Sequence, residues 1–126
     1  MSEATRYEKG MAVLEKLFGP ATARVKMSED FRRITVENLF GDIWSRPGLA
    51  LRERSIITLT ALLVLGREAE LRLHLRGARN LGIPRETIEE IMIHLAHYGG
   101  WPVAASGFRV LDEVFSAIDA EAKAGG

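Results

Sequence analysis

The segment from Leu51 to Leu65 restricts the fold most, because after a charged first turn it is apolar on nearly every side. Its apolar run, broken by Thr58 and Thr60, is far too short for a bilayer, which needs about 20 residues. A helix of this composition is usually buried on more than one side. A chain of 126 residues hides only limited apolar surface, so we expect a homo-oligomer rather than a monomer.

Apolar periodicity predicts helices elsewhere too, and no stretch shows the sustained alternation of a strand. Gly19-Pro20, the turn at Arg46-Pro47-Gly48 and Gly99-Gly100 separate the helices. Ser28 is expected to cap one helix, and Pro84 to occupy the first position of another. The expected ranges are 7–18, 29 to about 44, 51–65, 67–81, 84 to about 98 and about 102–120. We predict a single all-α domain over residues 1–126, a bundle of about six helices with frayed first residues and a frayed tail at 122–126.

Charge and composition exclude several classes of function. Lysine plus arginine number 17, as do aspartate plus glutamate, so no net field attracts nucleic acid or an anionic membrane. The absence of cysteine excludes disulfides, thiolate metal sites and cysteine nucleophiles. The polar N-terminus lacks the apolar stretch of a secretory signal. We therefore expect a cytoplasmic protein with neither nucleic-acid nor membrane partners.

Glu70 and His74 are the first candidates for chemistry. They lie four residues apart, which places them on one face of a helix. A carboxylate one turn before an imidazole can fix its tautomer and raise its basicity, as a general acid or base requires. A solvated surface pair has the same spacing, and spacing alone favours that alternative.

A second group, consisting of His94, His97, Tyr98 and Trp101, surrounds the end of the fifth expected helix. Two histidines at this spacing can bind zinc, with His74 as a third ligand, but nothing in the sequence brings the three together. The alternative is a helix C-terminus at which the dipole favours histidine and the aromatic rings fill the core. We expect no metal.

Arg52, Arg54 and Arg109 form the third group, because arginine binds a carboxylate at two points. The alternative is a surface ion pair with Glu53 or Asp112. No P-loop, G-x-G-x-x-G or H-E-x-x-H pattern occurs, which argues against nucleotide-driven and hydrolytic chemistry.

Several ordered motifs run through most of the chain. They are Trp44-Ser-Arg-Pro-Gly-Leu, Arg52-x-Arg-Ser-Ile-Ile-Thr-Leu, Leu65-Gly-Arg-Glu-x-Glu-Leu-x-x-His-x-Arg-x-Ala, Asn80-x-Gly, Glu89-Glu-Ile and Tyr98-x-Gly-x-Pro-x-Ala. In this order the motifs resemble the carboxymuconolactone decarboxylase family. The resemblance implies an alkylhydroperoxidase D-like fold, commonly built into a homohexamer, with a trimer as the fallback. The peroxidase branch has two cysteines before a histidine. Setting His74 on that histidine puts Arg67 and Glu70 in their places, so thiol chemistry is impossible here.

The same resemblance implies a carboxy-lyase that uses no cofactor and acts on a small anionic lactone. The reaction would convert 4-carboxymuconolactone to 3-oxoadipate enol-lactone in aromatic-compound breakdown, the β-ketoadipate pathway. Arg52 or Arg54 would hold the spectator carboxylate, and Glu70 would orient His74. We expect His74 to give the proton, although it could instead donate to the carbonyl oxygen. The residues expected to bind substrate are Trp44, His94, His97, Tyr98 and Trp101.

The block from His94 to Pro102 departs from the family pattern, above all at His97 and Trp101. Two alternatives follow. One is a family paralogue that acts on a different small lactone or keto acid through an enolate. The other is a helical binding scaffold without catalysis.

Overall fold

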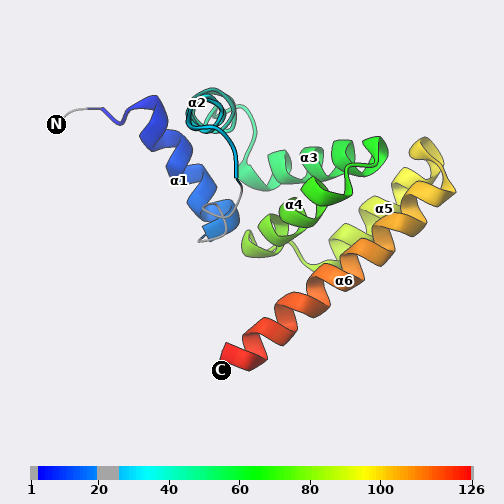
Figure 1. Cartoon of the computed structure of the whole chain (residues 1–126). Helices are drawn as coiled ribbons and strands as arrows, with labels where there is room; N and C mark the ends of the chain where they lie inside the picture. Colours follow the sequence, from blue (N-terminus) through cyan, green and yellow to red (C-terminus); the bar gives the residue numbers. More distant parts are fainter. Residues whose placement is uncertain (1–2, 20–25, 126) are drawn as a thin grey trace.

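The structure is a computed structural model that describes residues 3–19 and 26–125, and all regular elements in these ranges are helices. In order they are α1 (Arg6–Phe18), α2 (Glu29–Ile34), the π-helix η2 (Thr35–Ile43), α3 (Leu51–Leu65), α4 (Glu68–Asn80), α5 (Arg85–Gly99) and α6 (Trp101–Gly125) (Figure 1). The predicted all-α class is confirmed. No helix in the described ranges combines the length and hydropathy that a membrane span requires.

The helix ends follow the local signals, with a few differences. Ser28 caps α2 as expected, its hydroxyl accepting a hydrogen bond from the Phe31 amide at 3.1 Å. Pro84 is the N-cap of α5 rather than its first helical residue, because its ψ of 156° is extended. The last helix continues to Gly125, beyond the expected end near Ala120.

The second expected helix changes its winding partway along. It begins at Glu29 and continues from Thr35 as a π-helix, in which the Trp44 amide reaches back five residues to the Leu39 carbonyl at 2.9 Å. Single-sequence periodicity does not distinguish this winding from an α-helix. A π-turn carries an extra residue and is often found at functional sites. Here the π-helix ends at Ile43, directly before Trp44.

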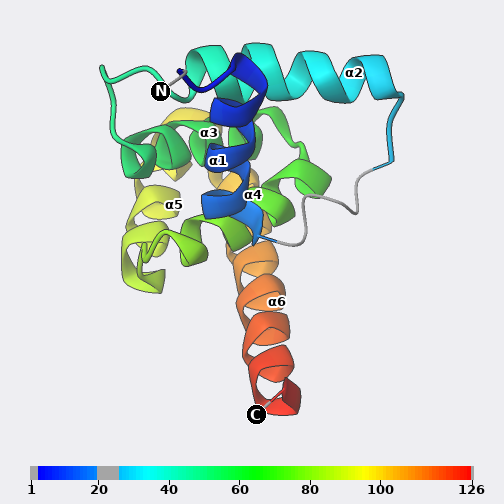
Figure 2. The same cartoon turned by 90° about the vertical axis from the view of Figure 1, so that its left-hand side faces the viewer.

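Two hydrophobic clusters hold the helices together, and α4 contributes to both. The larger unites α3, α4, α5 and α6 through Leu59, Leu63, Leu71, Leu75, Ile88, Met92, Val110, Leu111, Val114 and Phe115. The smaller unites α1 and η2 through Val13, Leu14, Leu17, Phe18, Val36, Phe40 and Trp44, with Leu73 of α4 packed against it. Figure 2 shows α1 crossing in front of α3 and α4, with α2 along the top. The boundary between the clusters therefore follows α4.

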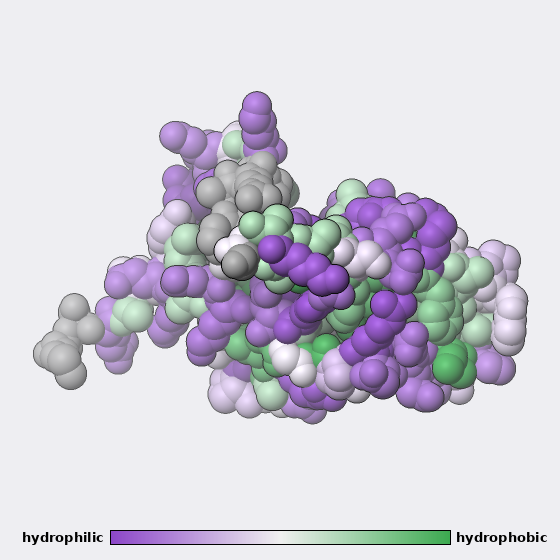
Figure 3. Space-filling model, turned by 90° about the horizontal axis from the view of Figure 1, so that it is seen from below, coloured by the Kyte–Doolittle hydropathy of each residue, from purple (hydrophilic) through white to green (hydrophobic). Residues whose placement is uncertain are grey.

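The expectation that α3 is buried on several sides is wrong for a single copy of the chain. Ile57 and Val64 are exposed on its outer face, and Leu65 at its end is 71% exposed. An apolar area is visible at the right-hand end of Figure 3, the end of the molecule where α3 stops and α6 begins. Self-association that covers this surface stays a prediction.

Glycine allows α1 and η2 to approach closely. A Cβ atom added to Gly10 would overlap the Val36 carbonyl oxygen, and one added to Gly41 would overlap the Arg6 carbonyl oxygen. Both neighbours are backbone atoms, which cannot move aside without separating the two helices.

Gly10→Ala should therefore lower the free energy of unfolding by about 2 kcal/mol, because overpacking outweighs the better helix propensity of alanine. Urea unfolding followed by circular dichroism measures the change. The matched control is Gly48→Ala, since a Cβ there meets no atom within 4 Å. Equal stability of the two variants would contradict the close packing of α1 on η2.

Candidate functional site

His74 lies where α4 meets α1 and the end of η2. The Trp44 ring stacks on its imidazole at a centroid distance of 6.1 Å and an interplanar angle of 26°. The Phe18 ring meets it edge-on at 5.1 Å and 80°. The Nδ1 atom of His74 is buried and has no hydrogen-bond partner. A buried polar atom without a partner is costly, and in a native structure it calls for a ligand or water.

Burial determines the charge of this imidazole. It lowers the pKa of His74 to about 4, against a smaller opposing effect of the Glu70 carboxylate. His74 is therefore neutral near pH 7, with one ring nitrogen a donor and the other an acceptor. Glu70 is exposed and makes no hydrogen bond to His74 in the described structure. Its influence on the imidazole is that of a nearby charge.

Arg54 lies next to the same turn of the chain. Its Nη2 donates a hydrogen bond to the carbonyl of Arg46 at 3.0 Å, two residues after Trp44. Its Nε is buried without a partner, as is the hydroxyl of Ser55, a residue only 1% exposed. The turn at residues 44–46 therefore contacts His74 through Trp44 and Arg54 through Arg46.

The other candidate arginines are placed differently. Arg52 is exposed, since two residues along a helix rotate the side chain by about 200° away from Arg54. The alternative partner Glu53 instead accepts a hydrogen bond from the Ala50 amide at 2.8 Å. Arg109 pairs with Glu68 at 2.9 Å and not with the expected aspartate. Of the three candidate arginines, Arg54 is thus the one that the turn at residues 44–46 links to His74.

The residues around the end of α5 form a separate group. His94 stacks on Tyr98 with centroids 5.1 Å apart, and the His97 ring meets the Trp101 ring edge-on at 6.0 Å. Tyr98 is 80% and Trp101 71% exposed, so the alternative in which these rings fill a core is wrong.

This group lies at the far end of α3 from Arg54. A Cβ added to Gly99 would be 3.1 Å from Val64 Cγ2, which places the end of α5 against the C-terminal part of α3. Arg54 is in the first turn of α3, so about 15 Å of helix separates it from Val64. Within one copy, the predicted site residues therefore fall into two clusters. Over residues 3–19 and 26–125, no three or more histidine, aspartate or glutamate side chains are grouped to hold a metal ion.

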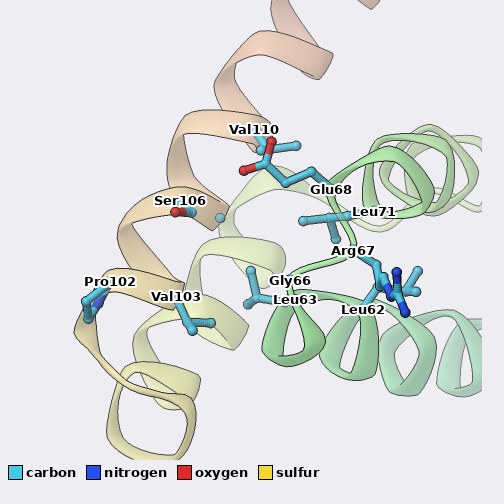
Figure 4. A pocket seen from close by; sticks show the side chains of 11 residues that line it. Leu62, Leu63, Gly66, Arg67, Glu68, Leu71, Pro102, Val103, Ser106 and Val110 are labelled. Atoms are coloured by element: carbon cyan, nitrogen blue, oxygen red, sulfur yellow. The ribbon is translucent and has the colours of Figure 1, made fainter.

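Two of the hollows in the described structure are lined almost entirely by residues that the sequence did not predict. One, of about 210 Å³, lies between the end of α3, the start of α4 and α6 (Figure 4). The other, of about 350 Å³, borders Trp44 and is lined by Lys9, Lys16 and Arg46 among others. A faint sequence signal exists for the second, since Lys9 and Lys16 are seven residues apart and share a helical face. No sequence signal exists for Phe18 beside His74, because this is a contact between distant segments.

Comparison with known proteins places the candidate residues in a region shared with one protein family. The model of the family described as "Carboxymuconolactone decarboxylase family" matches residues 29–113. A 4-carboxymuconolactone decarboxylase of Acinetobacter baylyi is 33% identical over 121 residues, which cover 91% of this chain and 90% of that protein. A nitrosuccinic acid decarboxylase of Metarhizium robertsii is 41% identical over 73 residues, 56% of this chain and 50% of that protein. The region matched by the family model includes Trp44, Arg54 and His74.

Proposed function

This chain belongs to the carboxymuconolactone decarboxylase family, and from that premise we propose that it decarboxylates 4-carboxymuconolactone to 3-oxoadipate enol-lactone without a cofactor. Two relatives named as decarboxylases support a carboxy-lyase. The observation that carries the proposal is the buried, unpartnered Nδ1 of a neutral His74, packed against Trp44. A neutral nitrogen in an apolar wall suits a reaction that creates charge on an oxygen.

The substrate supplies its own electron sink. The bond between the γ-carbon and its carboxylate breaks, and CO₂ leaves. The electron pair moves through the ring double bond onto the lactone carbonyl oxygen, forming a dienolate, and a proton then adds to the α-carbon. The protein has to hold the second carboxylate, stabilise the negative charge on the lactone carbonyl oxygen and let a proton reach the α-carbon.

In this proposal His74 donates its N–H to the carbonyl oxygen. A pKa of about 4 leaves little imidazolium near pH 7, so the neutral ring is a poor proton source for carbon. It remains a good hydrogen-bond donor, and one donor to a developing oxyanion is typically worth about 3 kcal/mol of barrier. The role of proton donor that we expected from the sequence passes to solvent. Glu70 acts on the ring through its charge.

Arg54 binds the spectator carboxylate in this scheme. The Arg46 carbonyl holds its Nη2, and its buried Nε has no partner and is free to donate. Arginine can hold a carboxylate through two parallel N–H donors. The faces of Trp44 and Phe18 give the departing carboxylate an apolar surrounding, which favours its loss as uncharged CO₂.

Two substrates given separately to the purified protein test the function. With 4-carboxymuconolactone we expect one CO₂ per lactone consumed, at a rate that chelator does not change. If the protein turned over nitrosuccinic acid and not the lactone, the proposed substrate would be wrong and the carboxy-lyase class would stand. Turnover of neither by a folded, assembled protein would favour the binding scaffold.

Our proposals for the oligomeric state and the cellular location rest on the same family membership. We propose a cytoplasmic homohexamer, with a trimer as the fallback, whose contacts cover the exposed outer face of α3. The exposed Ile57 and Leu65 support this proposal, because a monomer would leave them in water. Light scattering on the purified chain measures the subunit number.

A further inference from the structure

We propose that the groove beside Trp44 is a dianion-selecting site in which Lys9, Lys16 and Arg46 attract and help to hold the carboxylate that the substrate keeps. The inference rests on the proposed function and deepens it, because it names the residues that prefer a second negative charge. The ligand class is a small dicarboxylic acid.

The groove is built by α1 and the chain between η2 and α3. Lys9, Ala12, Val13 and Lys16 follow the i, i+3, i+4, i+7 spacing, so they lie on one face of α1. The opposite wall consists of Trp44, Ser45, Arg46, Leu49 and Leu51. The groove has a volume of about 350 Å³, which is within the range of small-molecule sites, about 300 to 1,000 Å³.

The charged residues that line the groove are all cations. Lys9, Lys16 and Arg46 make no ion pair in the described part of the chain, and no acidic side chain lines the walls. The nearby carboxylate of Asp42 is already bound by Arg6 at 2.7 Å. This hydrogen bond, and to a lesser extent the Lys9 charge, keeps the pKa of Asp42 below its usual range. A hollow lined by one sign of charge concentrates ligands of the opposite sign.

The groove and the proposed reaction site share one turn of the chain. Trp44 lines the groove and stacks on His74. Arg46 lines the groove and accepts the Arg54 hydrogen bond through its carbonyl. A carboxylate bound at this turn would have Arg54 on one side and the groove cations on the other. If the reacting carbon of the substrate lies at His74, the side arm that carries the second carboxylate reaches this turn.

The experiment compares 4-carboxymuconolactone with its side-arm methyl ester, which carries one charge fewer. In the Lys9→Gln/Lys16→Gln double variant, the ratio of kcat/KM for the acid to that for the ester should fall about tenfold, mainly through KM for the acid. The acid's KM in the wild type should rise with salt, because exposed charges are screened. Lys123→Gln, an exposed lysine of α6, is the matched control. An unchanged ratio in the double variant would overturn the inference.

Equilibrium binding keeps this test separate from turnover. Calorimetry with adipate, an unreactive dicarboxylate, should show weaker binding to the double variant than to the wild type and to Lys123→Gln. This difference would support the groove even if the lactone were not turned over. Equal adipate binding by all three proteins would overturn the groove whatever the catalytic result.

Discussion

Replacing His74 by glutamine is expected to lower kcat for 4-carboxymuconolactone by about 10²- to 10³-fold while the helices stay folded. The variant loses the imidazole N–H that the proposal aims at the developing oxyanion, and a single such donor typically accounts for this much rate. Because the donor acts mainly in the transition state, KM should change much less than kcat. Steady-state kinetics on the assembled protein measures both.

The control is His94→Gln, which makes the same chemical change at an exposed histidine at the other end of α3. Its kcat should stay within about twofold of wild type if the two clusters are independent. A His74→Gln protein with near-normal kcat and a native circular dichroism spectrum would remove His74 from the mechanism. A large loss in His94→Gln would instead mean that both clusters serve one site, as contact between subunits would allow.

The second large expected effect is a loss of stability in mild acid. An unfolded chain protonates its histidine near pH 6.5, whereas burial lowers the pKa of His74 to about 4 in the folded chain. Between these values the unfolded state binds more protons, so the free energy of unfolding falls as the pH falls. The effect is absent above about pH 6.5 and complete below about pH 4. The full difference corresponds to about 3 kcal/mol.

His74→Phe provides the comparison for this prediction, because it keeps a ring against Trp44 and Phe18 and cannot titrate. Urea unfolding near pH 7 and again near pH 4.5 gives four free energies. The wild type should lose about 2 to 3 kcal/mol more than the variant between the two pH values. Carboxylates that titrate in the same pH range affect both proteins equally, so their contribution cancels in the difference between the two losses. Parallel losses would show that His74 is accessible to protons in the folded state.

Helix positions could be predicted from the sequence because their signals are local. Gly66 takes the left-handed conformation that ends α3, and the Ser28 hydroxyl caps α2, both within a few residues of the signal. The winding of η2 could not be predicted, because periodicity does not distinguish a π-helix from an α-helix, and neither could the close approach of α1 and η2 at Gly10 and Gly41. Such a contact between helices leaves no periodic trace in either one.

The candidate site was predictable in type and only partly in arrangement. Spacing made His74 a candidate, residue type did the same for Arg54, and the resemblance added Trp44. In the fold, the turn at residues 44–46 contacts both His74 and Arg54. The same methods grouped His94 and Trp101 with these residues, because the order of motifs along the chain does not tell how far apart they lie in the fold. The depressed pKa of His74 was also out of reach, because it arises from packing against Phe18 and Trp44.

The unpartnered atoms at the start of α3 and in α4 have a consequence for evolution and for engineering. Nδ1 of His74, Nε of Arg54 and the Ser55 hydroxyl each weaken the resting fold, and an apolar residue at any of the three positions would relieve that weakness. Selection for heat resistance alone would therefore erase these three residues first. Their persistence in a thermally selected library would be a sign that activity was still under selection.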